Sequence, residues 1–202
     1  MTDVVRGDEL GEESRRPITE VLVGGFAEDF AYFSPDPAKV ADAFAHMILP
    51  GRFHVALVDG KPAAVASLTT GEQQCFAPKR REFRRHLGFV HGTISHLVVR
   101  SQFMGVPDDA GEDVAEIGFV TTAPAHQGRG VATALLTHLL ALPEHRTYVL
   151  QDIKDTNVAA LALYRKLGFT PYRRRPVRFA RRAGFTEYVS MRLEQRPPSP
   201  AG

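Results

Sequence analysis

One segment in the second half of the chain constrains the fold more than any other. Residues 116 to 133 read Glu-Ile-Gly-Phe-Val-Thr-Thr-Ala-Pro-Ala-His-Gln-Gly-Arg-Gly-Val-Ala-Thr, and a helical run continues to Leu142. This order predicts an apolar strand, a turn with two glycines and then a helix. The first backbone N–H groups of a helix have no partner within it, so they form a site suited to a pyrophosphate. The segment therefore favours an enzyme that binds a nucleotide cofactor.

The composition bounds the class of protein. A chain of 202 residues suits one domain with its own core. The 25 Lys and Arg residues nearly balance 23 Asp and Glu, which argues against nucleic acid as a partner. The single cysteine, Cys75, excludes a disulfide framework and favours a reducing compartment. Because no stretch approaches the ~20 apolar residues of a membrane span, we expect a cytoplasmic protein without a membrane partner.

The first half of the chain predicts two helices and a hairpin. Residues 1–17 contain at most a short strand near Val4 and a linker, and apolar spacing predicts a helix over residues 18–33. A second helix is expected from Pro37 to Met47. Two apolar runs around an Asp-Gly pair then predict a hairpin over residues 53–68.

Residues 76–113 resemble an inserted helical arm, interrupted near Gly88 and Gly92. The arm could fold over the active site or form a subunit interface, as in a homodimer, and the sequence does not choose. The remaining elements are expected to be a strand at 114–121, a helix at 128–142, a strand at 147–153, a helix at 157–167 and strands at 171–177 and 187–193. We predict one α/β domain over residues 18–193, with a central mixed twisted sheet and helices on both faces, and a disordered tail at 194–202.

The glycine turn could bind either of two nucleotide cofactors, a dinucleotide or coenzyme A. A dinucleotide fold accounts for Gly128, Gly130 and Asp152 at the end of the next strand. However, Thr133 stands where that motif has a third glycine or alanine, and seven residues separate Val120 from the first glycine. A Walker A loop is excluded because no Gly-Lys-Ser/Thr follows.

The other cofactor is coenzyme A: with the turn at residues 127–132 and the helical block at residues 157–169, the chain resembles the GNAT superfamily of N-acetyltransferases. Residues 127–132, Gln-Gly-Arg-Gly-Val-Ala, fit the acetyl-CoA signature Gln/Arg-x-x-Gly-x-Gly/Ala at every fixed position. Residues 157–169, Asn-Val-Ala-Ala-Leu-Ala-Leu-Tyr-Arg-Lys-Leu-Gly-Phe, match the later block Asn-x-x-Ala-x-x-Leu-Tyr-x-x-x-Gly-Phe without a mismatch. Asn157 and Tyr164 are seven positions apart, so two helical turns place them on one face.

The resemblance implies acetyl-CoA as the acyl donor and transfer to a small-molecule or peptide amine by direct attack in a ternary complex. It implies that the donor is held by Phe119, Val120, Thr122, Gln127, Gly128, Arg129, Gly130, Val131, Ala132, Thr133, Asn157 and Tyr164. A non-catalytic acyl-CoA-binding regulatory module is the alternative. No spacing supports a metal site, so we expect no metal.

The chemistry needs a base, an acid and an oxyanion donor. Alternation puts Glu116, Gly118 and Val120 on one face of their strand, with Ile117 and Phe119 on the other. Glu116 is our candidate base, because burial would raise its pKa toward the value that a base needs. Some family members are similar here, with a base Glu eleven residues before the motif Gln. Asp152 is the second candidate and a water chain the third.

The resemblance implies that Tyr164 is the acid that protonates the leaving thiolate, and that a backbone N–H near Val120 contacts the thioester carbonyl. Cys75 is a poor nucleophile, because nothing near it suggests a lowered pKa. Arginines crowd residues 173–182 and 79–85. They would suit an acidic acceptor, but a solvated surface is the favoured interpretation.

Overall fold

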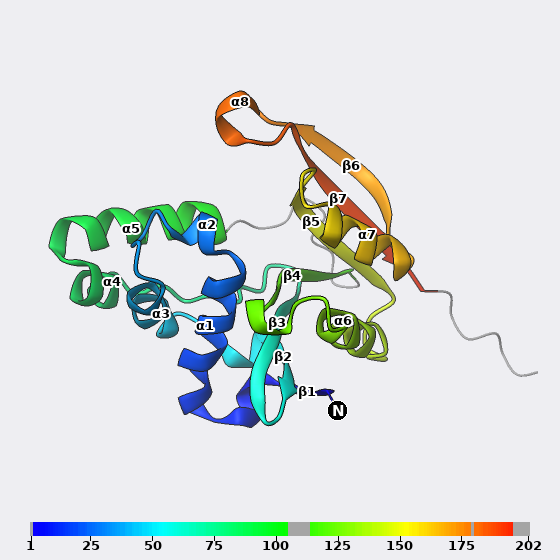
Figure 1. Cartoon of the computed structure of the whole chain (residues 1–202), viewed down its shortest axis with the longest axis horizontal. Helices are drawn as coiled ribbons and strands as arrows, with labels where there is room; N and C mark the ends of the chain where they lie inside the picture. The colour runs from blue at the N-terminus through cyan, green and yellow to red at the C-terminus, as the bar shows by residue number, and fades with distance from the viewer. Residues whose placement is uncertain (1, 105–113, 179, 196–202) are drawn as a thin grey trace, which may run out of the picture.

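Seven strands form one mixed sheet in the computed structural model, which describes residues 2–104, 114–178 and 180–195 (Figure 1). The strands are β1 (Thr2–Arg6), β2 (Phe53–Val58), β3 (Lys61–Thr70), β4 (Val114–Thr122), β5 (Thr147–Lys154), β6 (Thr170–Pro176) and β7 (Glu187–Glu194). Their order is β1-β2-β3-β4-β5-β7-β6. Among these strands, only β4 and β5 pair in parallel. The expected mixed sheet is confirmed, and a doubly wound dinucleotide fold is excluded because its sheet is mostly parallel.

Helices cover both faces of the sheet, as expected (Figure 1). They are α1 (Arg15–Gly25), α2 (Ala27–Phe30), α3 (Pro37–Ala45), α4 (Arg80–Leu87), α5 (Phe89–Phe103), α6 (Val131–Leu140), α7 (Val158–Lys166) and α8 (Ala180–Ala183). The described residues also form short 3-10 turns, η1 (Gly7–Leu10), η2 (Glu12–Ser14), η3 (Pro50–Arg52) and η4 (Pro124–His126). Of the helices in these described ranges, none has the length and apolar character that crossing a membrane requires.

Two hydrophobic cores hold these layers together, one on each face. The first joins α1, α3, α4 and α5 to the sheet and contains Phe44, Phe53 and Phe83, all fully buried. The second joins α6 and α7 to the sheet and contains Leu135, Tyr148 and Ile117. Because β-strand side chains alternate between faces, β2 contributes Val55 to the first core and Ala56 to the second.

Two expectations about helices need correction, and one further helix is present. The helix expected over residues 18–33 is broken at Phe26, whose φ of −116° and ψ of 36° are not helical, so α1 and α2 are separate. Gly88 does interrupt the arm, with φ at +84°, but Gly92 lies inside α5. A Cβ at Gly92 would lie 2.3 Å from the carbonyl oxygen of Phe83, so this glycine allows α5 to cross α4 closely. Helix α8 was not expected.

The strand alternation expected around Glu116 is also wrong beyond Gly118. Phe119 has a left-handed φ of +50°, and the β3–β4 register shifts at this point. This bulge reverses the alternation, so Phe119 packs against the first core while Val120 packs against the second with Ile117. Residues 105–113 of the arm and residues 196–202 of the expected tail lie outside the described ranges.

The C-terminal end of α1 provides a test of this packing. A Cβ at Gly25 would lie 1.3 Å from Oγ1 and 2.7 Å from Cβ of Thr121 on β4. We predict that Gly25→Ala lowers the free energy of unfolding by about 1–3 kcal/mol, the usual cost of overpacking, measured by denaturant unfolding. Gly24→Ala is the matched control, because its Cβ would meet Pro124 at an ordinary 3.6 Å. Equal stability of the two variants would contradict the close packing of α1 on β4.

Candidate active site

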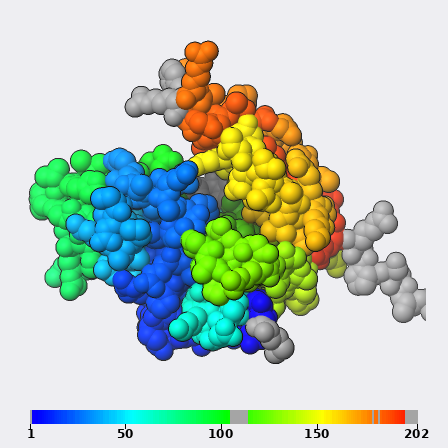
Figure 2. Space-filling view, viewed as in Figure 1, coloured from blue at the N-terminus to red at the C-terminus, as the bar shows by residue number. Residues whose placement is uncertain are grey.

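The site is a cavity of about 1,020 Å³ that opens where β4 and β5 separate. Their pairing covers only three residue pairs and stops at Glu116 and Val149. Just beyond this point each strand carries a residue with left-handed φ, Phe119 on β4 and Asp152 on β5, and each strand's register shifts against its other neighbour. The cavity surface is hollowed between α1 and α2 on one side and β5 and α7 on the other (Figure 2).

The glycine turn lies between β4 and α6. Gln127 donates a hydrogen bond from Nε2 to the backbone oxygen of Thr122 at 3.2 Å, which closes the turn. Gly128 and Gly130 have φ values of +71° and +78°, and a Cβ at either would meet nothing within 4 Å. Helix α6 begins at Val131, three residues later than expected, and no side chain caps it. The N–H groups of its first turn are therefore available to an anion.

Helix α7 supplies the two later motif residues, and both line the cavity. The Oδ1 atom of Asn157 accepts a hydrogen bond from the backbone N–H of Ala160 at 3.2 Å, so Asn157 caps the helix. Tyr164 is 5% exposed and packs against Phe169 with ring centroids 6.1 Å apart. Burial raises the pKa of Tyr164, so the phenol stays protonated throughout the physiological range.

Glu116 lies on β4 at the point where the two strands part. Burial, and to a smaller extent the negative charge of nearby Asp152, raise the pKa of Glu116 to about 7. Thr69 of β3 and Val149 of β5 are its neighbours in the sheet. Glu116 is not among the residues that line the cavity, whereas Gly118, two positions further along the same strand, is. A proton would therefore pass between Glu116 and the cavity through an intervening group such as water.

Asp152, the second candidate base, lines the cavity but is engaged in an ion pair. Arg175 approaches its carboxylate at 3.0 Å, and the same guanidinium lies 4.9 Å above the ring of Tyr188. The side chain of Asp152 is 47% exposed. Between the two carboxylates, the burial of Glu116 makes it better suited to accept a proton near neutral pH.

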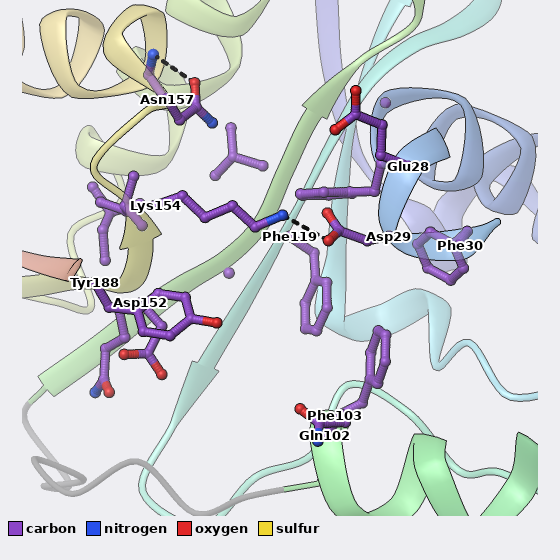
Figure 3. A pocket seen from close by; sticks show the side chains of 18 of the residues that line it. Glu28, Asp29, Phe30, Gln102, Phe103, Phe119, Asp152, Lys154, Asn157 and Tyr188 are labelled. Atoms are coloured by element: carbon purple, nitrogen blue, oxygen red, sulfur yellow. Dashed lines mark hydrogen bonds and ion pairs between the residues drawn. The ribbon is translucent and has the colours of Figure 1, made fainter. Parts of the chain in front are cut away.

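Several cavity residues were not identified from the sequence. Lys154 at the end of β5 reaches across the cavity to Asp29 of α2, with Nζ 2.7 Å from Oδ1 (Figure 3). Glu28 lies beside Asp29 on the same short helix. Phe103 at the end of α5 stacks on Phe119. These residues come from elements far apart in the chain and belong to no local motif, so only the assembled fold brings them together.

The expected site residues therefore fall into three groups. Phe119, Val120, Asn157 and Tyr164 line the cavity together. The turn from Gln127 to Thr133, with Thr122, is outside the lining, but Pro124 just before it approaches the cavity residue Gly24. Glu116 adjoins the cavity without lining it. Burial raises the pKa of Cys75 to about 12, so this thiol is protonated and a poor nucleophile.

Among the described residues, no group of three or more His, Cys, Asp or Glu side chains could hold a metal ion. The expectation that the enzyme needs no metal is not tested by this observation.

Comparison with known proteins places the chain in a family. The model of the acetyltransferase (GNAT) family matches residues 25–169. The chain therefore belongs to the GNAT acetyltransferase family, as the sequence motifs indicated. A comparison with curated protein sequences gives no match.

Solved structures share the fold at low sequence identity. The ribosomal-protein-S18-alanine N-acetyltransferase from Escherichia coli is 17% identical, with 100% of this chain and 99% of that chain covered and a TM-score of 0.58. An N-acetyltransferase from Staphylococcus aureus Mu50 is 18% identical over 95% and 100% of the two chains, with a TM-score of 0.60. The protein yncA from Salmonella typhimurium, whose structure holds its cofactor acetyl-CoA, is 18% identical over 98% and 96%, with a TM-score of 0.53.

Proposed function

We propose that this protein is an N-acetyltransferase that moves an acetyl group from acetyl-CoA to a primary amine of a small molecule or peptide. The observation that carries the proposal is the parting of β4 and β5 beside the glycine turn. The parted strands leave a passage for a thread such as a pantetheine arm, and the turn offers N–H groups to its pyrophosphate. The family membership and the acetyl-CoA found in the yncA structure support the same donor.

The donor site consists mainly of backbone. The exposed N–H groups from Gly128 to Thr133 bind the pyrophosphate, and Arg129 adds a positive charge at the same turn. Asn157 and Tyr164 contact the arm from α7. Beyond Glu116, β4 is no longer paired with β5, so a backbone N–H near Phe119 or Val120 can donate to the thioester carbonyl and then to the oxyanion.

The reaction proceeds by direct attack in a ternary complex. The neutral amine attacks the thioester carbon, a C–N bond forms and the C–S bond breaks. Glu116 accepts the proton that the amine loses, through water, and Tyr164 donates a proton to the departing thiolate. An acetyl-cysteine route is disfavoured, because burial raises the pKa of Cys75, the chain's single cysteine, to about 12.

Calorimetry with acetyl-CoA and NAD tests the donor. We predict binding of acetyl-CoA and none of NAD, and a tenfold or greater loss of acetyl-CoA affinity in Gly130→Asn, roughly the value of one charge-assisted hydrogen bond. Asparagine tolerates the left-handed backbone at this position, but its side chain would enter the space above the turn. An unchanged affinity, with the thermal midpoint also unchanged, would contradict anion binding at this turn.

The pH profile of kcat/KM tests the base. Glu116 can accept a proton only when ionised, so we predict activity that is present above about pH 7 and lost as the pH falls through that value. Glu116→Gln should remove this fall in kcat/KM near pH 7, the acidic limb of the profile, and lower kcat/KM by about a hundredfold or more. Asp152→Asn should keep the limb and move it to lower pH, because the Asp152 charge raises the Glu116 pKa. A limb that survives Glu116→Gln and disappears in Asp152→Asn would transfer the role to Asp152.

Removing the hydroxyl of Tyr164 tests whether this residue is the general acid. We predict that Tyr164→Phe lowers kcat by about a hundredfold or more, the range of general acid catalysis, and leaves the affinity for acetyl-CoA within about twofold. Thiol release measures turnover, and calorimetry measures binding. An unchanged kcat would exclude the acid role. Binding of acetyl-CoA by the wild-type protein without thiol release across a broad amine panel would favour the regulatory module instead.

A further inference from the structure

The cavity passes from one face of the sheet to the other, which separates a donor end from an acceptor end. Of the cavity residues, Tyr164 belongs to the core on the α6 and α7 face, and Val120 and Ala160 pack against that core. Phe30, Phe103 and Phe119 belong to, or pack against, the core on the opposite face. A thioester carbonyl held near Val120 therefore faces an incoming amine that enters from the side of α1, α2 and α5. The chemistry of the residues that line this end indicates which acceptor would bind there.

Aromatic rings form one wall of the acceptor end. Phe103 and Phe119 stack with centroids 5.5 Å apart and an interplanar angle of 8°. Phe30 adjoins Phe103 with centroids 5.9 Å apart, so three rings from α2, α5 and β4 are continuous. Figure 3 shows the rings of Phe103 and Phe119 side by side at the cavity. Flat apolar surface of this kind favours an acceptor with an aromatic body.

The charged residues of the cavity have an acidic balance. The lining contains three carboxylates, Glu28, Asp29 and Asp152, against two cations, Lys154 and Arg175. Both cations are already engaged, Lys154 with Asp29 and Arg175 with Asp152. In the parts of the chain that the structure describes, Glu28 has no ion-pair partner. A cation is therefore attracted to this end of the cavity, and an anion is repelled.

Lys154 indicates where an ammonium group can lie. Its Nζ crosses the cavity to Asp29 (Figure 3) and also lies 5.7 Å from the ring centroid of Phe185. Both partners are exposed, Lys154 at 37% and Asp29 at 50%, and exposed ion pairs contribute little stability. An ammonium on an incoming molecule can therefore replace Lys154 at low cost. The cavity therefore already holds an alkylammonium of this chain against the carboxylate of Asp29.

We infer that the acceptor is a cationic amine with an aromatic body on a short alkyl chain, bound with its ring against Phe103 and Phe119 and its charge near Glu28 and Asp29. This inference rests on the proposed function and specifies its acceptor. On transfer the ammonium loses two protons, one before attack and one as the C–N bond forms, and the thiolate gains one. The products are the neutral amide, the free thiol of CoA and one released proton.

The arginine clusters do not define this acceptor. Arg174 pairs with Glu187 and Arg175 pairs with Asp152, so both are neutralised within the fold. On the arm, Arg84 bonds to Thr93 and lies 4.1 Å above the ring of Phe89. Their charges are therefore partly used to hold the hairpin and the arm, which argues against an acidic acceptor.

The inference is tested by comparing kcat/KM, measured as release of the CoA thiol, within two pairs of matched amines. Phenylalaninamide and phenylalanine share ring and amine but differ by a carboxylate, and 2-phenylethylamine and butylamine differ by the ring. We predict a kcat/KM at least about tenfold higher for the first member of each pair, since tenfold reflects a modest difference in binding free energy. Glu28→Gln should reduce the ratio of phenylalaninamide to phenylalanine by about two- to fivefold, the scale of an exposed charge interaction. Phe103→Leu should reduce the ratio of 2-phenylethylamine to butylamine.

The controls separate this inference from the proposed function. Glu72→Gln makes the same charge change on an exposed turn outside the cavity, and both ratios should stay at the wild-type value. Acetyl-CoA binding is measured in parallel by calorimetry for every variant. If acetyl-CoA binds but phenylalanine or butylamine is used as well as its partner, or no panel member reacts, the inference is overturned and the donor assignment stands. If acetyl-CoA does not bind, the proposed function itself fails.

Discussion

The structure depends on two backbone distortions that face each other across one strand pair. Phe119 and Asp152 both adopt left-handed φ values near +50°, which cost about 1–2 kcal/mol each for residues with a side chain. Each bulge bends its strand just after the shared pairing ends at Glu116 and Val149. Two well-packed cores on either side hold the strands in this arrangement. Without the bulges β4 and β5 would continue to pair, and the cavity between them would close.

The same parting of the strands explains the electrostatics of the site. Glu116 is the last residue of β4 that still pairs with β5, so it is surrounded by the sheet on two sides while the cavity begins just beyond it. Burial at this boundary, together with the charge of Asp152 that the second bulge places nearby, raises the pKa of Glu116 to about 7. The backbone distortion and the perturbed carboxyl therefore have one structural origin. A strand that paired along its whole length would leave Glu116 with no route to a substrate.

Sequence reasoning recovered the elements that local patterns encode. Gly128 and Gly130 signalled the turn, and the block from Asn157 to Phe169 signalled α7, because glycines and helical spacing act over a few residues. The bulge at Phe119 could not be found in this way. A phenylalanine in a strand predicts an extended conformation, and left-handed φ is rare for bulky residues. The alternation rule therefore assigned Phe119 to the wrong face. The break at Phe26 was missed for a similar reason, since the apolar spacing continues through it.

The two ends of the cavity differ in how they are built, and this explains why only one of them is visible in the sequence. In the proposed function, donor binding relies on backbone N–H groups at one turn beside the cavity, and backbone exposure requires glycines at defined positions, so it leaves a local motif. The proposed acceptor end relies on side chains from α2, α5, β4 and β5 that meet only in the folded protein. Substitutions at the acceptor end would alter its aromatic rings and its charges without disturbing the glycine turn. In our proposal the chain thus keeps a donor site encoded by the motifs at residues 127–132 and 157–169, while its acceptor is set by residues outside them, such as Glu28 and Phe103.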